Sequence, residues 1–293
     1  MPVKLSTYLK NEYGEKVYRL SLSSGCGCPN RDGKVGTGGC TFCSEGGSGE
    51  FAASGSIDDQ ISQAKEKIQK KTDARKFIAY FQSFTNTYGD TCYLKKLYSN
   101  AINRDEVVIL SLGTRPDCVG PEVIDMLKEL NEIKPVWVEL GLQTIHDESA
   151  RAFNRGYDLA VFSDAYRRLK EAGLTVVVHL IMGLPGETKE MMLESVKFLA
   201  ELDPPLDGIK IQNLQILKGT KMYEQFEKEP FYIMSMEEYT DLVAKALSLL
   251  PESCVVHRMQ GDGPRKLLVE PMWSLDKKRV LNMLTAKTKG ILK

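Results

Sequence analysis

Short apolar runs alternate with longer amphipathic segments along most of this chain. Several runs are almost continuous in β-branched and aliphatic residues, as in the Val-Val-Val-His-Leu-Ile stretch that ends at Ile181. Such runs are typical of parallel strands that are buried on both faces. The pattern predicts strands at Val17–Leu22, Lys76–Phe81, Val107–Leu112, Val136–Leu142, Thr175–Met182 and Gly208–Leu214. Strands that alternate with helices indicate an α/β fold, either a barrel or an open doubly wound sheet.

The segments between these strands have helical patterns and capping signals at their ends. Ser56 is the expected N-cap of a helix over Ile57–Lys71, because the acids Asp58 and Asp59 follow it. Proline at a first turn and Gly173 as a C-cap support two further helices. These and a fourth helix are predicted at Pro121–Leu130, Ser163–Ala172 and Lys189–Leu202.

Polar residues follow the C-terminal ends of the predicted strands, at residues 82–88, 113–117, 143–146, 183–188 and 215–220. Active sites of (β/α) barrels lie on this rim, so the distribution favours a barrel. A chain of 293 residues is long enough for one such barrel. We expect a catalytic domain over residues 1–230 and a C-terminal extension over residues 231–293 that packs on it.

A glycine-rich loop with three cysteines, here called the cysteine loop (residues 28–43), follows the first predicted strand. It reads Cys28-Pro-Asn-Arg-Asp-Gly33, six further residues, and then Cys40-Thr-Phe-Cys43. Thiolates bind soft metal centres, and the glycines allow the loop to fold over one. Zinc is one interpretation, with Cys26 as a fourth ligand, although zinc ribbons usually pair two C-x2-C arms. An iron–sulfur cluster on three cysteines, with one iron open, is the interpretation that we favour.

Cysteine usage and hydropathy predict the compartment. The seven cysteines are odd in number, and the N-terminal residues lack the apolar core of a signal peptide. No run of about 18 apolar residues is present in the sequence. We therefore expect a cytoplasmic protein that does not associate with a membrane.

Charge is unevenly distributed along a chain whose formal net charge is zero. Residues 255–293 contain nine Lys or Arg residues and three acidic residues, which leaves 30 basic and 36 acidic residues in the remainder. This basic tail is a candidate phosphate-binding surface, and a solvated helix end is the structural alternative.

An ordered set of motifs covers most of the chain. The motifs are Gly25-x2-Cys28-Pro-Asn-Arg-Asp-Gly33, Gly38-Gly-Cys40-Thr-Phe-Cys43-Ser, Gln82-x-Phe-Thr-Asn-Thr-Tyr88, Gly113-Thr-Arg-Pro-Asp117, Glu139-Leu-Gly-Leu-Gln-Thr144, Asn154-Arg-Gly156, His179-Leu-Ile-Met-Gly-Leu-Pro-Gly-Glu-Thr188, Leu217-Lys-Gly-Thr220 and Gly261-Asp-Gly-Pro-Arg265 with Trp273-Ser-Leu. This set resembles the radical S-adenosylmethionine (SAM) superfamily, and more narrowly its YtqA/YhcC-type subfamily, which is related in core pattern to the catalytic subunit of Elongator. The eleven residues between Cys28 and Cys40 match the subfamily and not the superfamily's common C-x3-C-x2-C spacing. The resemblance implies a partial (β/α)6 TIM-like barrel with a C-terminal extension.

The resemblance also implies the cofactors and the residues that hold them. A [4Fe–4S] cluster would be bound by Cys28, Cys40 and Cys43 and would reductively cleave SAM to a 5′-deoxyadenosyl radical. Cys26 is not a ligand in the family pattern. Residues implied to contact SAM are Phe42 and Gly183 near the adenine, Asn86 near the amino group, Arg155 at the carboxylate, His179 near the ribose, and Gln143. For His179 a satisfied core histidine, and for Arg155 a surface arginine, are the structural alternatives.

The resemblance finally implies a substrate, which is tRNA. The expected reaction converts a 5-carboxymethylaminomethyl group at C5 of wobble uridine to 5-aminomethyl, and the basic tail agrees with RNA binding. A reductase or a flavodoxin- or ferredoxin-type protein would supply the electron. Two alternatives stay open: a radical SAM enzyme that acts on a small molecule or a peptide, and a non-enzymatic zinc-binding RNA module.

Overall fold

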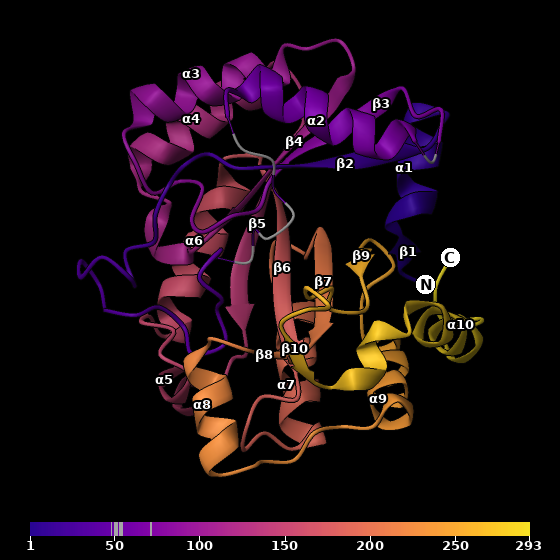
Figure 1. Cartoon of the computed structure of the whole chain (residues 1–293). Coiled ribbons are helices and arrows are strands. Elements are labelled where there is room, and N and C mark those ends of the chain that lie inside the picture. Colours follow the sequence, from indigo (N-terminus) through magenta and orange to yellow (C-terminus); the bar gives the residue numbers. More distant parts are fainter. Residues whose placement is uncertain (48, 50–51, 53–54, 71) are drawn as a thin grey trace.

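A computed structural model describes residues 1–47, 49, 52, 55–70 and 72–293, and within them eight strands form one parallel sheet (Figure 1). Their order across the sheet is β1-β9-β7-β6-β5-β4-β3-β2. The strands are β1 (Val3–Lys4), β2 (Val17–Leu22), β3 (Lys76–Phe81), β4 (Val107–Thr114), β5 (Val136–Gln143), β6 (Thr175–Met182), β7 (Gly208–Asn213) and β9 (Val255–Arg258). Two short strands, β8 (Ile216–Leu217) and β10 (Leu268–Glu270), pair with each other in antiparallel orientation.

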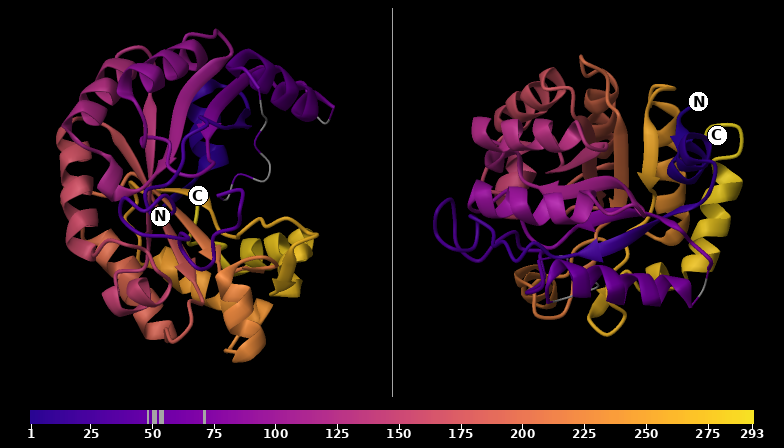
Figure 2. Two further views of the ribbon diagram at one scale, coloured as in Figure 1. Left: turned by 60° about the vertical axis from the view of Figure 1, so that its left-hand side comes forward. Right: turned by 90° about the horizontal axis from the view of Figure 1, so that it is seen from above.

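Helices connect successive strands, and most of them cover the outer face of the curved sheet, whereas α1 packs against the lumen side (Figure 2). They are α1 (Leu5–Tyr13), α2 (Ile57–Gln69), α3 (Thr91–Ile102), α4 (Pro121–Asn131), α5 (Asp147–Ala152), α6 (Leu159–Glu171), α7 (Lys189–Ala200), α8 (Lys221–Lys228), α9 (Met236–Ser248) and α10 (Lys277–Lys287), with short 3-10 turns at Pro116–Cys118 and Met272–Leu275. None of the described helices combines the length and the hydropathy that are needed to cross a bilayer.

The six predicted strands are confirmed, and so is the predicted α/β half-barrel. The Ser56 hydroxyl accepts a hydrogen bond from the backbone N–H of Asp59, as expected of an N-cap. Residue 71, the predicted end of this helix, lies outside the described residues. α6 begins four residues earlier than expected, because Asp158 caps it by accepting from the Val161 N–H. The sheet also gains β1 and β9, whose short sequences carry no strand pattern of their own.

Alternation along each strand separates two environments. Residues such as Phe81, Leu112 and Val138 face the helices and belong to the large apolar core. Alternate residues face the lumen of the half-barrel, where Ile78, Ile109 and Trp137 pack against Leu9 and other residues of α1. α1 therefore closes the N-terminal end of the lumen with apolar contacts, and the lumen is accessible from the C-terminal rim.

The C-terminal region contributes to the sheet as well as packing on it. β9 pairs with β7 on one side and with β1 on the other. The two chain ends also lie side by side (Figure 1), since Lys4 N donates to Lys293 O at 2.8 Å and Lys293 N donates to Pro2 O at 3.0 Å. The predicted division near residue 230 stays a prediction, but the extension supplies β9, the strand between β7 and the edge strand β1.

Candidate active site

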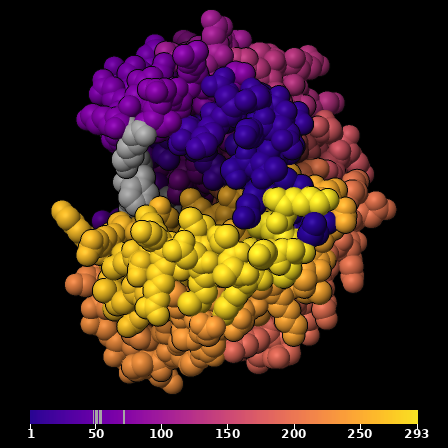
Figure 3. Space-filling model, turned by 90° about the vertical axis from the view of Figure 1, so that its right-hand side faces the viewer, coloured from indigo at the N-terminus to yellow at the C-terminus, as the bar shows by residue number. Residues whose placement is uncertain are grey.

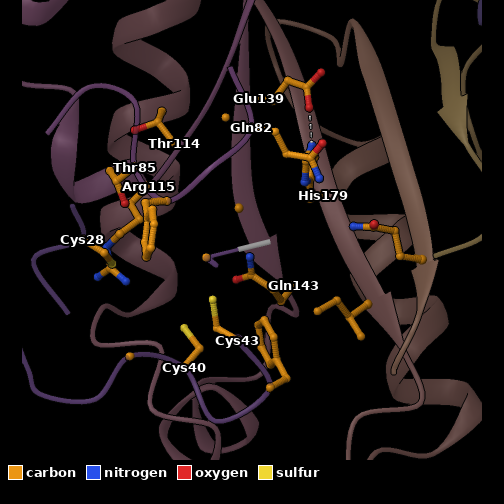
Figure 4. Close-up of a pocket in the computed structure, with 18 of the residues that line it drawn as sticks. Cys28, Cys40, Cys43, Gln82, Thr85, Thr114, Arg115, Glu139, Gln143 and His179 are labelled. Atoms are coloured by element: carbon orange, nitrogen blue, oxygen red, sulfur yellow. Dashed lines mark hydrogen bonds and ion pairs between the residues drawn. The ribbon is translucent and has the colours of Figure 1, made fainter. Parts of the chain in front are cut away.

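A pocket with a volume of about 250 Å³ opens at the C-terminal rim of the half-barrel. Its lining comes from the cysteine loop, from the ends of β3 to β7 and from β9. Figure 4 shows that the sulfur atoms of Cys40 and Cys43 lie at one end of this pocket and that Glu139 and His179 lie at the other. The pocket thus joins a thiol-lined outer end to a charged inner end within the barrel.

The cysteine loop is held in place by the segment that follows α5. Asn30 is buried and donates through Nδ2 to Asn154 O at 2.6 Å, and Asn154 Nδ2 donates to Gly39 O at 2.9 Å. The backbone N–H of Thr41 donates to Phe153 O at 2.9 Å. Gly39 has a φ of +74°, a conformation that glycine adopts without strain. These contacts fix the loop across the mouth of the barrel.

All three predicted ligand cysteines line the outer end of the pocket. Burial, with smaller contributions from the neighbouring Cys43 and Cys28 thiols, raises the pKa of Cys40 to about 12, although Arg115 opposes the shift. Among the described residues, no three His, Cys, Asp or Glu side chains form a group that is ready to hold a metal ion. The donor chemistry nevertheless fits an iron–sulfur cluster, since three soft thiols face one cavity and binding to iron would offset the energetic cost of ionising them.

Phe42, Gln143 and His179, three of the predicted cofactor residues, also line the pocket. The ring of Phe42 packs on Phe153 with centroids 5.3 Å apart. Gln143 lies at a register shift between β5 and β6 and has a φ of +65°. Figure 4 shows that its amide lies between the cysteines and the charged inner end.

Arg155, which was predicted to contact the SAM carboxylate, is fully buried and absent from the pocket lining. Its guanidinium donates to the backbone carbonyls of Leu142, Thr144 and Tyr157 at 2.7–2.9 Å and pairs with Asp147 at 3.0 Å. Arg155 therefore stabilises the turn that carries Gln143. A motif places a residue in sequence, but it does not determine which way a long side chain points.

Asn86 and Gly183 are likewise absent from the lining of this pocket. Asn86 Nδ2 donates to Phe81 O at 3.0 Å and Gly113 O at 2.8 Å, and its Oδ1 accepts from Ser24 Oγ at 2.7 Å. These bonds join the ends of neighbouring strands. Gly183 borders a smaller cavity near Met234, and its φ of +92° explains the glycine. In this geometry both residues support the rim, and neither faces the pocket that the cysteines line.

Several pocket residues were not among the predicted site residues. Arg115 lines the pocket, is ion-paired with Asp117 at 2.7 Å and donates through Nη1 to Arg155 O at 2.9 Å. Other polar residues of the lining are Gln82, Thr85, Thr114, Tyr157, Gln212, Asn213, Gln215 and Arg258. Gln82, Thr85, Thr114 and Gln215 lie in the polar segments after the strands. Arg258 comes from β9, for which the sequence offered no strand signal.

The inner end is built around Glu139, which is fully buried on β5. Its carboxylate accepts from Ser111 Oγ at 2.8 Å and pairs with His179 Nε2 at 2.8 Å and with Lys210. Although burial opposes it, the neighbouring Lys210 ammonium, together with His179, holds the pKa of Glu139 well below its usual range. Burial and the nearby Lys210 lower the pKa of His179 to about 4, so the imidazole is neutral at pH 7.

Two family models match the chain. The model described as Radical SAM superfamily covers residues 22–199, and the model described as Radical_SAM C-terminal domain covers residues 206–289. The protein YtqA of Bacillus subtilis is 43% identical over 283 residues, which are 96% of this chain and 87% of that protein. The protein YhcC of Escherichia coli is 36% identical over 267 residues, which are 90% of this chain and 85% of that protein.

More distant similarity extends to proteins of the Elongator type. A tRNA uridine(34) acetyltransferase of Methanocaldococcus jannaschii is 32% identical over 164 residues, which are 56% of this chain and 30% of that protein. The structure of Elp3 from Methanocaldococcus infernus has a TM-score of 0.70 at 21% identity, over 94% of this chain and 63% of that one. This structural likeness shows that the two chains share a fold.

Proposed function

Because the chain belongs to the radical SAM superfamily, we propose that it is a tRNA-modifying enzyme that acts on the C5 side chain of wobble uridine. The proposed reaction converts 5-carboxymethylaminomethyluridine to 5-aminomethyluridine in three steps. The carboxymethyl carbon loses a hydrogen atom, the resulting radical loses one electron and a proton to form a C=N bond, and water cleaves that bond and releases glyoxylate. The electron passes to an oxidised flavodoxin- or ferredoxin-type protein. The chain is a radical SAM enzyme, and members of this superfamily use a [4Fe–4S] cluster and SAM. One observation carries the proposal: a single pocket is lined by three thiols at its outer end and by the polar side chains of Glu139, His179 and Arg258 deeper in the barrel.

Within this proposal, Cys28, Cys40 and Cys43 hold the cluster, and Cys26 does not take part. Cys26 is absent from the pocket lining, and a Cβ on Gly89 would lie 3.5 Å from its sulfur. Its thiol therefore packs between the loop and the start of α3.

The residues between the two ends of the pocket fit SAM. Gln143 offers an amide, and Thr85 and Thr114 offer hydroxyls. Three of the five N–H groups of Arg115 donate hydrogen bonds, two to Asp117 and one to Arg155 O. The other two can donate to a carboxylate of SAM. Phe42 supplies an apolar surface beside the thiols. We assign SAM to this middle region.

When bound, the cluster and SAM supply a radical that removes a hydrogen atom from the substrate. The chain's own residues position the reactants and shield the radical from bulk solvent. Ile181, Leu214 and Leu217 form an apolar side of the pocket, and such a wall protects a reactive species from solvent. Glu139 holds Ser111, His179 and Lys210 in place through hydrogen bonds and an ion pair. The substrate therefore meets a preorganised polar surface at the inner end.

Two observations support tRNA as the substrate. The M. jannaschii relative has a name that refers to uridine 34 of tRNA, although the match covers 30% of that protein. Exposed cations also lie beside the pocket: Arg265 and Lys266 follow Gly261, which is part of the lining. Figure 3 shows that the C-terminal residues, in yellow, form one broad side of the molecule. We further propose that a cytoplasmic flavodoxin- or ferredoxin-type protein supplies the electron.

The family match bears on the alternatives. A non-enzymatic zinc-binding RNA module is not retained, because the superfamily model covers residues 22–199. A small-molecule or peptide substrate is the competing hypothesis for the same site, and the next experiment separates it from tRNA.

The test is turnover by the reconstituted enzyme. Protein reconstituted anaerobically with iron and sulfide is mixed with SAM, a reductant and tRNA that carries 5-carboxymethylaminomethyluridine, and the digested nucleosides are measured by mass spectrometry. We expect 5-aminomethyluridine to form together with 5′-deoxyadenosine. If 5′-deoxyadenosine forms while the tRNA stays unchanged, the tRNA assignment is wrong and a smaller substrate is favoured.

Cysteine variants test the ligand assignment in the same preparation. Single Ala variants of Cys28, Cys40 and Cys43 should lose iron and all SAM cleavage, whereas Cys26→Ala should keep both. Cys92→Ala is the matched control, because Cys92 is exposed on α3 and absent from the pocket lining. Full iron loading in Cys40→Ala would remove this residue from the cluster site.

A further inference from the structure

The inner end of the pocket holds more cations than anions. Arg258 lines it from β9, and Lys210 is its register partner on β7. Arg19 of β2 also reaches this region, since its guanidinium carbon lies 5.6 Å from the centre of the Tyr80 ring. Among the described residues that line the pocket, the one carboxylate is Glu139. Arg258 lines the pocket, whereas Lys210 and Arg19 lie outside the lining and close to the same acid.

The negative charge of Glu139 is already matched within the protein. One carboxylate oxygen accepts from Ser111 and the other pairs with His179 and Lys210. Lys210 is also buried and donates to the hydroxyl of Tyr80 at 3.0 Å. Lys210 and Glu139 neutralise each other, so the charge of the two guanidinium groups is not compensated by this pair.

Arg258 and Arg19 make only neutral contacts in the described part of the chain. Arg258 Nη1 donates to Gln212 Oε1 at 3.2 Å, and Arg19 Nη2 lies 3.2 Å from His257 Nδ1. No ion pair joins either guanidinium to a described carboxylate, and the Nε of Arg19 is buried with no hydrogen-bond partner among the described residues. Partly buried cations without an anionic partner are costly, unless a ligand supplies the anion.

SAM and the substrate are the two candidate sources of that anion. Glu139 and His179 lie at the opposite end of the pocket from Cys40 and Cys43 (Figure 4), and Arg258 donates to Gln212, whose register partner on β6 is Ile181. SAM is assigned to the middle region of the pocket, against residues at the ends of β3, β4 and β5, whereas Arg258 reaches the pocket from β9. An anion at the inner end therefore belongs to the substrate.

We propose that Arg258 binds a carboxylate of the substrate inside the lumen of the half-barrel. The inference rests on the proposed function, in which this group is the carboxylate of the 5-carboxymethylaminomethyl side chain. A planar guanidinium pairs with a carboxylate through two parallel N–H···O bonds, and Gln212 supports Arg258 from the neighbouring strand. The carbon that gives up hydrogen is bonded to this carboxylate, so holding the carboxylate also positions that carbon.

The same contact explains how product and substrate are distinguished. The 5-aminomethyl product lacks the carboxylate, so it cannot pair with Arg258. A site built to bind a charged group discriminates strongly against an analogue that lacks it, because the buried partner is left unpaired. We therefore expect the product to leave more readily than the substrate.

The test compares Arg258→Gln and Arg258→Lys with the parent holoenzyme on tRNA that carries 5-carboxymethylaminomethyluridine. Arg258→Gln should lower kcat/KM for tRNA by about 30-fold or more, whereas Arg258→Lys should recover part of this loss because it keeps the charge. Iron content and urea unfolding of both variants show whether the cluster and the fold are intact. Arg75→Gln is the matched control, since Arg75 is exposed and precedes β3 at the opposite end of the strands.

A calorimetric binding measurement separates this inference from the proposed reaction. The holoenzyme with SAM is titrated with the nucleoside 5-carboxymethylaminomethyluridine and, separately, with 5-aminomethyluridine. The parent should prefer the carboxylate by tenfold or more, and Arg258→Gln should show no preference. Preference without tRNA turnover would refute the reaction and keep the carboxylate site. Turnover that is equal in parent and Arg258→Gln, or the same nucleoside preference in both, would overturn the site.

Discussion

Arg155 and Gln143 form one unit at the end of β5. The guanidinium of Arg155 satisfies the carbonyls of Leu142 and Thr144 on either side of Gln143. The positive φ of Gln143 is held by this arrangement, and the amide is turned into the pocket. The two side chains thus have separate tasks, since one builds the turn and the other faces the ligand.

This division predicts different outcomes for two Ala variants. Arg155→Ala leaves buried carbonyls and Asp147 without their partner and should lower the free energy of unfolding by about 3–5 kcal/mol. Gln143→Ala should leave stability within about 1 kcal/mol of the parent but weaken SAM binding roughly 10- to 150-fold. Anaerobic urea unfolding and SAM titration measure the two effects. If Arg155→Ala keeps the stability of the parent but loses affinity for SAM, Arg155 contacts SAM directly and its structural role is refuted.

A second residue-scale prediction concerns pH. The pKa of His179 is about 4 in the folded protein and about 6.5 in an unfolded chain, so only the unfolded state takes up a proton between these values. Stability therefore falls as pH drops through this window, by about 2 kcal/mol between pH 6.5 and pH 5. The lowered pKa of Glu139 acts in the same direction, but below about pH 4.5. Urea unfolding at pH 6.5 and pH 5 measures the free energy of unfolding, and its decrease should be smaller by about 2 kcal/mol in His179→Gln than in the parent. An equal decrease in both proteins would contradict a neutral, buried His179.

At the scale of single elements, the bulge at the end of β5 determines which side chain at this end of the strand points into the pocket, and this is Gln143. The register shift between β5 and β6 includes Gly141 and Gln143. A Cβ on Gly141 would lie 2.5 Å from Nε2 of Gln143, so the missing side chain leaves room for the amide. The hydroxyl of Tyr157 contacts both residues, which ties the bulge to the loop before α6.

Gly141→Ala should therefore act through Gln143. The atom displaced is the far end of a flexible side chain, so we expect a stability loss below about 1 kcal/mol and a fall in SAM affinity similar to that of Gln143→Ala. Gly120→Ala is the control, because no atom lies within 4 Å of the new Cβ. SAM titration and urea unfolding of both variants provide the measurement. Unchanged SAM affinity in Gly141→Ala would mean that the Gln143 amide has no contact with SAM.

At the scale of the whole molecule, the two chain ends together complete the half-barrel. β9 places Arg258 beside the lumen, and the loop after it carries Arg265 and Lys266 to the rim. Lys277, at the start of α10, pairs with Asp262 of that loop at 2.5 Å. Lys287 pairs with Glu237 and Asp241 of α9. The basic tail is thus partly neutralised, and the exposed cations Arg265, Lys266, Lys278 and Arg279 are the ones we expect to meet phosphates.

The salt dependence of tRNA binding tests this surface. If four cations contact phosphates, the logarithm of the binding constant should fall with the logarithm of salt concentration at a slope of about −3 to −4. Replacing these four residues with Gln should flatten the slope, while SAM cleavage without tRNA continues. The control is Lys128→Gln with Lys197→Gln, both exposed on helices of the outer layer. A slope near zero in the parent would end the RNA assignment for this surface.

The sequence by itself determined the sheet, the thiol loop and the family. Each central strand coincides with a local run of apolar residues, and the motifs have fixed spacing along the chain. Both signals can therefore be recognised without knowing which distant residues are in contact. β9 was not predictable, because Val255–Arg258 is short and becomes a strand only by pairing with β7 and β1. The tertiary structure alone decided that Arg155 and Asn86 support the rim while Arg115 and Arg258 face the cavity. Side-chain direction depends on which carbonyls and charges the folded chain brings within reach, and the sequence pattern does not encode those distances.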